Sequence, residues 1–273
     1  MASSGEVRTG VRFNVREFAR TAHGNFRASL ELAEFAGKPL DADSLLIVRY
    51  LARLESATME HLRNLLVTAT HKDARVTAFL VTWAFEKFWI ADALDAVLEA
   101  NGSPRSRDVD EGHRRRTLAE ASERRGPIRR AISAIRQGVP IIAVHMTTGL
   151  IDEWIMRVAY EQLAAASGSP ALTGAIGTIL DIKRRHADFF DDESRRRLAE
   201  SPRAVVLTKK ALSQAVWPIG AIDRAGKDRT IFDTFVFAGK DGAARASSIS
   251  ARIAALPGID VHTAALVGQR LLP

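Results

Sequence analysis

Ionisable residues interrupt the apolar stripes of four predicted helices in this 273-residue sequence. Glu55, Glu86 and Glu153 each fall three or four residues from apolar residues, a spacing that turns them toward the interior. Lys183 and His186 hold the same kind of position on a fourth predicted helix. A carboxylate in a protein core costs several kcal/mol unless it is paired or bound to a metal. These residues therefore predict either a metal site or a buried network of ion pairs.

Four long helices must position these groups. Apolar periodicity predicts helices over residues 43–70, 73–101, 140–166 and 170–200. Short turns join the first two helices and the last two, and one long, basic segment links the pairs. One long connection between two helical hairpins is typical of a ferritin-like bundle rather than of a simple up-down-up-down bundle.

The rest of the chain is predicted to extend this bundle. Residues 1–12 read as a loose tail, and a moderately regular helical pattern covers residues 14–35. The bundle is therefore expected to span residues 13–202, with residues 203–273 forming a C-terminal helical extension packed on it. The predicted fold class is all-α: a ferritin-like four-helix bundle with one long crossover and extra N- and C-terminal helices.

The sequence resembles the ferritin-like di-iron carboxylate proteins, specifically the branch related to acyl-carrier-protein desaturases. The segment from Trp83 to Trp89 is similar to that family's Trp-x-x-Glu-x-x-His motif. Residues 179–190, which contain Arg185 and His186, are similar to its second Glu-x-x-His helix. The resemblance covers about residues 43–200 and depends on the order and spacing of the motifs, since none is specific alone.

The resemblance implies a metal-ligand set that is incomplete here. The family places one Glu on each of two helices and a Glu-x-x-His motif on each of the other two. Four of the six positions keep a metal-binding residue type: Glu55, Glu86, Glu153 and His186. Trp89 stands at the His of the first motif and Lys183 at the Glu of the second. Both exchanges alter the site.

Two states of this site remain open. Glu86, Glu153 and His186 form a set that could hold one iron or manganese ion. Lys183, however, places an ammonium where a bridging carboxylate belongs, and it can neutralise the glutamates without a metal. We favour the metal-free, ion-paired core slightly over the one-metal site, and we do not expect an intact di-iron centre.

Other polar residues are weaker candidates. Tyr160 and His145 share the Glu153 helix and are candidates for contacting the ligand residues, although a buried tyrosine or histidine with a satisfied hydrogen bond is the commoner case. His61 and His23 lie in polar surroundings and are expected at the surface. The sequence assigns no catalytic residue.

Composition limits the classes of protein that remain. The chain has no cysteine, which excludes disulfides, thiolate nucleophiles and Cys-ligated metals. No signal peptide or membrane-spanning stretch is visible, so a soluble, cytoplasmic protein is expected. The net charge of +7 is concentrated in the crossover. Its arginines include Arg114, Arg115, Arg116, Arg124, Arg125, Arg129 and Arg130.

These arginines read equally well as a solvated helical face. Through the resemblance they imply a docking surface for an acidic acyl carrier protein. Nucleic-acid binding ranks last, because no aromatic or groove-reading motif accompanies the basic residues. A homodimer is also compatible with the sequence.

Two main functions follow. The first is a relative of the desaturases, with a metal-free or single-metal site, that acts on or binds an apolar or acyl ligand; as an enzyme it would be a non-haem metal oxidoreductase. The alternative is a non-catalytic binding or partner protein that has lost di-iron chemistry. Bound iron or manganese would separate the two.

Overall fold

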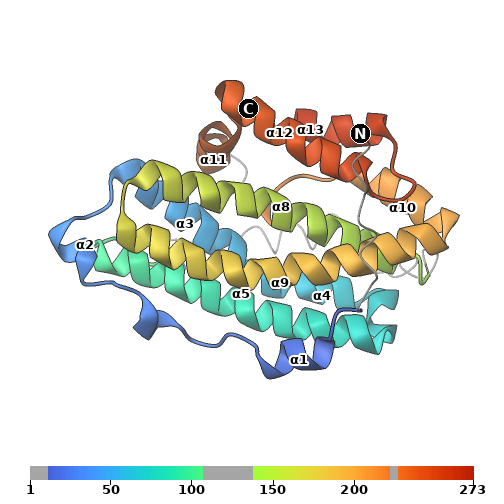
Figure 1. The fold of residues 1–273 in the computed structure, drawn as a ribbon, viewed down its shortest axis with the longest axis horizontal. Coiled ribbons are helices and arrows are strands. Elements are labelled where there is room, and N and C mark those ends of the chain that lie inside the picture. Colours follow the sequence, from blue (N-terminus) through green and yellow to red (C-terminus); the bar gives the residue numbers. More distant parts are fainter. Residues whose placement is uncertain (1–11, 107–137, 222–226) are drawn as a thin grey trace, which may run out of the picture.

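Four long helices lie side by side in a bundle (Figure 1). The computed structural model describes residues 12–106, 138–221 and 227–273, and within these ranges it contains helices and loops but no strand. The bundle helices are α3 (Ala42–Ser56), α5 (Ala74–Ala100), α8 (Ile141–Ser167) and α9 (Pro170–Glu200). α3 packs on α5 and α8 on α9, and contacts of α3 with α8 and of α5 with α9 close the bundle. The predicted all-α fold class is confirmed.

Side-chain caps fix where three of these helices begin. Asp41, Asp73 and Ser169 each accept a hydrogen bond from the backbone N–H three residues further on. Pro170 then fits the first turn of α9, where its missing N–H costs nothing. At the other end of α8, Gly168 takes a positive φ of 57°, the left-handed conformation that commonly ends a helix. These local signals explain why α5, α8 and α9 lie close to their predicted bounds.

The single helix predicted over residues 43–70 is wrong. α3 ends at Ser56, a short helix α4 (Thr58–Leu66) follows, and a 3-10 turn (Ala69–Lys72) leads into α5. The Ser56 hydroxyl donates to the Arg53 carbonyl and competes with the helical hydrogen bonds at this point. Gly220, from a loop far along the chain, also packs against Ala57 at the junction. The bend therefore depends partly on a contact that local sequence does not encode.

The N-terminal helix predicted over residues 14–35 is also wrong. The segment instead forms three short pieces that run along α5: α1 (Val15–Arg20), a 3-10 turn (Arg27–Ser29) and α2 (Glu34–Gly37). The Thr21 hydroxyl donates to the Glu17 carbonyl where α1 stops. The segment then extends toward the bundle, where the backbone of His23 bonds to Glu86. That long-range bond compensates for the lost helical bonds.

The described residues of the C-terminal extension form four further helices: α10 (Pro202–Leu212), α11 (Lys227–Phe237), α12 (Gly239–Ala254) and α13 (Val261–Leu271). α10 and α12 pack on α8, and α11 packs on α3 and α8, so the extension covers one side of the bundle (Figure 1). The arginines of the crossover and the N-terminal tail lie outside the described residues. No helix among the described residues is both long and apolar enough to span a membrane.

Candidate functional site

Lys183 lies at the centre of a buried group of charged side chains. Its ammonium is 3.1 Å from Oε1 of Glu55 and 2.8 Å from Oε2 of Glu153. None of the three side chains is more than 2% exposed. Since Glu55 comes from α3, Glu153 from α8 and Lys183 from α9, this one ammonium group joins three helices of the bundle.

The fourth helix contributes Lys87, a residue that our sequence reasoning missed. Its Nζ is 2.9 Å from Oε2 of Glu55 and 4.0 Å from Oε1 of Glu153, and the side chain is 4% exposed. The available signal was its spacing: Lys87 lies four residues after Trp83 and three before Ile90, and both of these are buried. Two lysines, not one, therefore neutralise the buried glutamates.

Trp89 does not occupy the site, contrary to our expectation. Its side chain is only half-buried, and its ring packs edge-on against Phe85 and Phe88, which are exposed. Of the two predicted motif residues on α5, Glu86 is buried and bonds to His186, whereas Trp89 lies outside the site. Lys87, the residue after Glu86, contacts Glu55 instead.

Glu86 and His186 form a second pair beside the lysines. The Nε2 atom of His186 lies 2.7 Å from Oε2 of Glu86, and its Nδ1 lies 3.6 Å from Oε1 of Glu153. The other oxygen of Glu86 accepts the backbone N–H of His23 at 2.8 Å and lies 3.4 Å from Arg185. Burial raises the pKa of Glu86, but the hydrogen bond and charge of His186, the backbone N–H of His23 and the charge of Arg185 together outweigh burial and lower the pKa. His23 thus has a direct contact with the site, which we did not expect.

Each of the two other glutamates also accepts a hydrogen bond from a neutral donor. The Tyr160 hydroxyl donates to Oε1 of Glu55 at 2.9 Å, and the Trp83 indole donates to Oε1 of Glu153 at 3.1 Å. Each carboxylate oxygen of Glu55, Glu86 and Glu153 therefore has an N–H or O–H group within 3.1 Å. His145, the other candidate on α8, instead lies 2.7 Å from the Thr70 hydroxyl.

The lysines hold the glutamates in their ionised form. Burial raises the pKa of Glu55 and Glu153, but Lys183 and Lys87 together outweigh burial, so both values lie below the ordinary one. Burial likewise lowers the pKa of Lys183, while Glu153 and Glu55 more than restore it and raise it above its ordinary value. The buried site is therefore a network of full charges.

The residues present do not fit a di-metal centre. A metal ligand must offer a lone pair, yet the carboxylate oxygens already face N–H and O–H donors. The ammonium of Lys183 lies between the two carboxylates that would have to share a cation. Among the described residues, no group of three or more His, Asp or Glu side chains has a geometry that could hold a metal ion.

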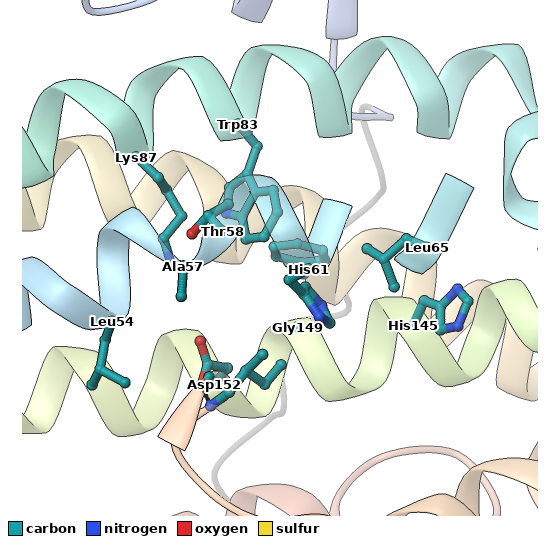
Figure 2. Close-up of a pocket in the computed structure, with 13 residues that line it drawn as sticks. Leu54, Ala57, Thr58, His61, Leu65, Trp83, Lys87, His145, Gly149 and Asp152 are labelled. Carbon is teal, nitrogen blue, oxygen red and sulfur yellow. Dashed lines mark hydrogen bonds between the residues drawn. The ribbon is translucent and has the colours of Figure 1, made fainter. Parts of the chain in front are cut away.

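A small cavity lies beside Lys87, where α3 gives way to α4. Its volume is about 20 Å³, and Figure 2 shows Lys87 and Trp83 reaching it from α5, His61 from α4 and Asp152 from α8. His61 is half-buried, contrary to the expected surface position. Burial, with a smaller effect of Lys87, lowers its pKa to about 4. Burial also lowers the pKa of His145, which lines the same cavity, to about 3. Both imidazoles are therefore neutral near pH 7.

Asp152 differs sharply from its neighbour Glu153. Burial raises the pKa of Asp152 to about 6, although Lys87 opposes the shift. One carboxylate oxygen of Asp152 accepts the backbone N–H of Ile219 at 2.7 Å. Two adjacent carboxyl groups on α8 thus have opposite pKa shifts, because only Glu153 lies in contact with Lys183.

Comparison with known proteins identifies the fold but not the activity. No known family model matches the sequence, and no curated protein matches it. Among solved structures, an R2-like ligand-binding oxidase, a variant anaerobically reconstituted with an Mn/Fe cofactor, is 16% identical with a TM-score of 0.50. The match covers 96% of this chain and 92% of that one. An R2-like ligand-binding oxidase with an aerobically reconstituted Mn/Fe cofactor is also 16% identical, over 95% and 89% of the chains, with a TM-score of 0.49.

The class that these observations define is the ferritin-like helical fold. At 16% identity, the likeness to the first oxidase establishes that fold alone. In this chain the fold encloses lysines and glutamates in direct contact.

Removing the central ammonium should destabilise the protein strongly. Lys183→Met leaves Glu55 and Glu153 with uncompensated charge, so we expect the free energy of unfolding to fall by about 3–5 kcal/mol. Adding Glu55→Gln to this variant should restore part of the loss, because the two residues are coupled. Urea denaturation measures both effects. Lys210→Met, the same change at an exposed position of α10, is the control; an equal, small effect at both lysines would contradict the network.

The raised pKa of Asp152 predicts that this residue lowers the free energy of unfolding as the pH rises. A carboxyl group that binds its proton more tightly in the folded state stabilises the fold at low pH and loses that contribution as the pH rises through its folded pKa. Relative to the Asp152→Asn variant, the parent should therefore lose about 1–3 kcal/mol of stability between about pH 4 and pH 7. Urea denaturation across this range tests the sign. Asp181→Asn, at an exposed site, controls for the loss of a charge, and a stability difference that stays constant with pH would refute the assignment.

Proposed function

We propose that this protein uses the ferritin-like fold without a metal centre and binds a small ligand that is mostly apolar. The observation that supports the proposal is the position of two ammonium groups, Lys87 and Lys183, against Glu55 and Glu153. An ammonium group carries the charge of a cation but has no vacant orbital to bind oxygen or substrate. This chemistry favours binding over oxidation, and it favours the metal-free reading of the desaturase-like motifs over the one-metal reading.

The cavity beside Lys87 is the proposed ligand site. Apolar side chains, among them Leu54, Leu65 and Phe190, form much of its lining, while Lys87 and Asp152 provide polar groups. A ligand with an apolar body and one polar end would satisfy both kinds of surface. The R2-like oxidase that shares the fold is itself described as ligand-binding. The resemblance to desaturases makes an acyl chain the first ligand class to test.

α4 is the element that would admit such a ligand. A cavity of about 20 Å³ holds only a water-sized group, so a larger ligand requires a movement of the surrounding helices. α4 has nine residues, and its N-cap Ala57 makes no side-chain capping bond. Only Thr58, Leu62 and Leu65 of α4 are buried. Short elements with few buried contacts open at low free-energy cost.

An oxidoreductase with one metal ion is the second candidate. It is favoured by His186, which lies 2.7 Å from Glu86 and 3.6 Å from Glu153. Metal binding there would require Lys183 to leave Glu153, its partner at 2.8 Å. Metal analysis separates the two candidates.

Protein purified from medium supplemented with iron and manganese should contain far less than one equivalent of either metal. The reason is that the lysines already supply the positive charge that a metal would bring. Elemental analysis by mass spectrometry measures the content, and melting with added Mn(II) or anaerobic Fe(II) should leave Tm unchanged. One equivalent of metal in the parent that disappears in Glu86→Gln would instead support the one-metal oxidoreductase.

Ligand binding should depend on the cavity at α4. We expect lauric acid or its uncharged amide to raise Tm and to remain bound in native mass spectrometry. His61→Trp should abolish both effects, because the indole would fill the cavity. His262→Trp, the same substitution at an exposed position of α13, should keep them. Equal binding by both variants, or no binding of either probe to the parent, would overturn the ligand site.

A further inference from the structure

A second and larger cavity lies on the outer side of α3, where α11 packs against it. Its volume is about 230 Å³. The described residues that line it come from these two helices: Leu46, Ile47, Arg49 and Arg53 from α3, and Asp228 and Ile231 from α11. None of them lines the cavity beside Lys87. Arg53 and Glu55 are two residues apart and so point to nearly opposite sides of α3. The cavity is therefore separate from the buried charge network.

The spacing of the lining residues follows from the two helices. Arg49 and Arg53 are four residues apart, so their side chains leave α3 from adjacent turns of one face. Asp228 and Ile231, three residues apart, likewise share one face of α11. Next to this face the rings of Tyr50 and Phe232 pack with their centroids 4.9 Å apart, and both side chains are buried. This contact holds α11 against α3 beside the cavity.

The apolar part of the cavity is large enough for a small ligand. Ile47 is 1% exposed, whereas Leu46 is 37% exposed and the Asp228 side chain 46%. The cavity thus has a buried apolar floor and a mouth that reaches solvent. A cavity of about 150 Å³ already holds benzene. The space between α3 and α11 can therefore take one aromatic ring together with a polar group, with no helix displaced.

The charged part of the cavity is positive. Two of the lining residues are arginines and one is an aspartate. Nη1 of Arg53 donates to Asp228 at 2.7 Å, so these two charges satisfy each other. Within the described part of the chain no hydrogen bond or ion pair engages Arg49, and its Nε is buried without an acceptor. A buried donor without an acceptor is unfavourable. The cavity therefore has one guanidinium group that lacks an anion.

We infer that this cavity binds a small carboxylate whose apolar body is about the size of one aromatic ring. The Arg49 guanidinium, turned into the cavity, presents Nε and one Nη together, which is the two-donor edge that matches a carboxylate. The apolar body lies against Ile47 and Ile231. Arg53 adds positive charge one helical turn away, and its bond to Asp228 reduces the repulsion between that aspartate and the ligand. The inference goes beyond the proposed function and does not depend on it.

Phenylacetate is the probe that tests this site. Titration calorimetry should show that the parent binds it. Phenylacetamide keeps the ring without the charge, and acetate keeps the charge without the ring. Each lacks one of the two recognised parts, so both should bind at least about tenfold more weakly. Equal binding of the amide would overturn the carboxylate, equal binding of acetate would overturn the apolar body, and no binding of phenylacetate would overturn the site.

Two variants locate the bound probe. Arg49→Met keeps an apolar stem but removes the donors, and it should weaken phenylacetate binding at least about tenfold with unchanged circular dichroism. Arg16→Met, at an exposed position of α1, should bind like the parent. Should Arg49→Met fail to fold, Leu46→Trp decides, because its indole fills the mouth. Val206→Trp, 66% exposed on α10, is its control.

Undiminished binding by the variants at Arg49 and Leu46 would overturn the site. Arg49→Met should bind the uncharged amide of lauric acid as the parent does, because that ligand belongs to the cavity at α4. A failure of this inference and a failure of the proposed function are therefore observed separately.

Discussion

The ammonium of Lys183 between Glu55 and Glu153 is the interaction on which the rest of the bundle depends. Three ionised glutamates in a core would each cost several kcal/mol without a partner, and no apolar contact could offset that cost. The contact with Lys183 couples α3, α8 and α9, and Lys87 adds α5 through Glu55. Each ammonium also lies over an aromatic ring, Lys87 Nζ 5.1 Å from the centroid of Trp83 and Lys183 Nζ 5.8 Å from that of Tyr160. The rings add a cation–π contribution to the ion pairs.

A lysine and a metal ion satisfy buried carboxylates in different ways. Each holds two carboxylates together, but an ammonium is covalently attached to its helix, cannot exchange and offers no coordination position. Tyr160 and Trp83 each add one hydrogen bond to the glutamates, to Oε1 of Glu55 and to Oε1 of Glu153. The network holds Glu55 and Glu153 in their ionised form inside the bundle. Asp152 shows how local this effect is, since the next residue along α8 keeps a raised pKa.

The sequence predicted the fold class and three of the four long helices because their signals are local. Caps at Asp73 and Ser169 and a left-handed glycine at 168 lie within one turn of the helix ends they define. The break at Ala57 could not be predicted in the same way, since it involves Gly220 from a distant loop.

The prediction that Trp89 lies in the site failed for a different reason. Adjacent residues on a helix point about 100° apart, and α5 is apolar on both its inner and its outer face. Nothing in its pattern therefore shows that Lys87 points inward beside Glu86 while Trp89 points away from the site. Contacts with other helices decide this, those of Lys87 with Glu55 and of Glu86 with His186. Periodicity identifies the buried face of a helix only when the opposite face is polar, and on α5 the exposed side chains of Val81, Phe85 and Phe88 remove that contrast.

The two buried lysines differ in how closely they contact the glutamates, and this difference indicates where the bundle can open. Lys183 holds two carboxylates within 3.1 Å, whereas Lys87 holds one at 2.9 Å and lies 4.0 Å from the second. The side of the core that Lys87 closes is therefore less tightly connected than the side closed by Lys183. The cavity lies on this side and is lined by Lys87, and the short helix α4 forms part of its wall. A ligand of the kind we propose would contact the part of the charge network held by Lys87 and leave the three-helix contact at Lys183 in place. The proposed ligand binding is therefore compatible with a stable charged core.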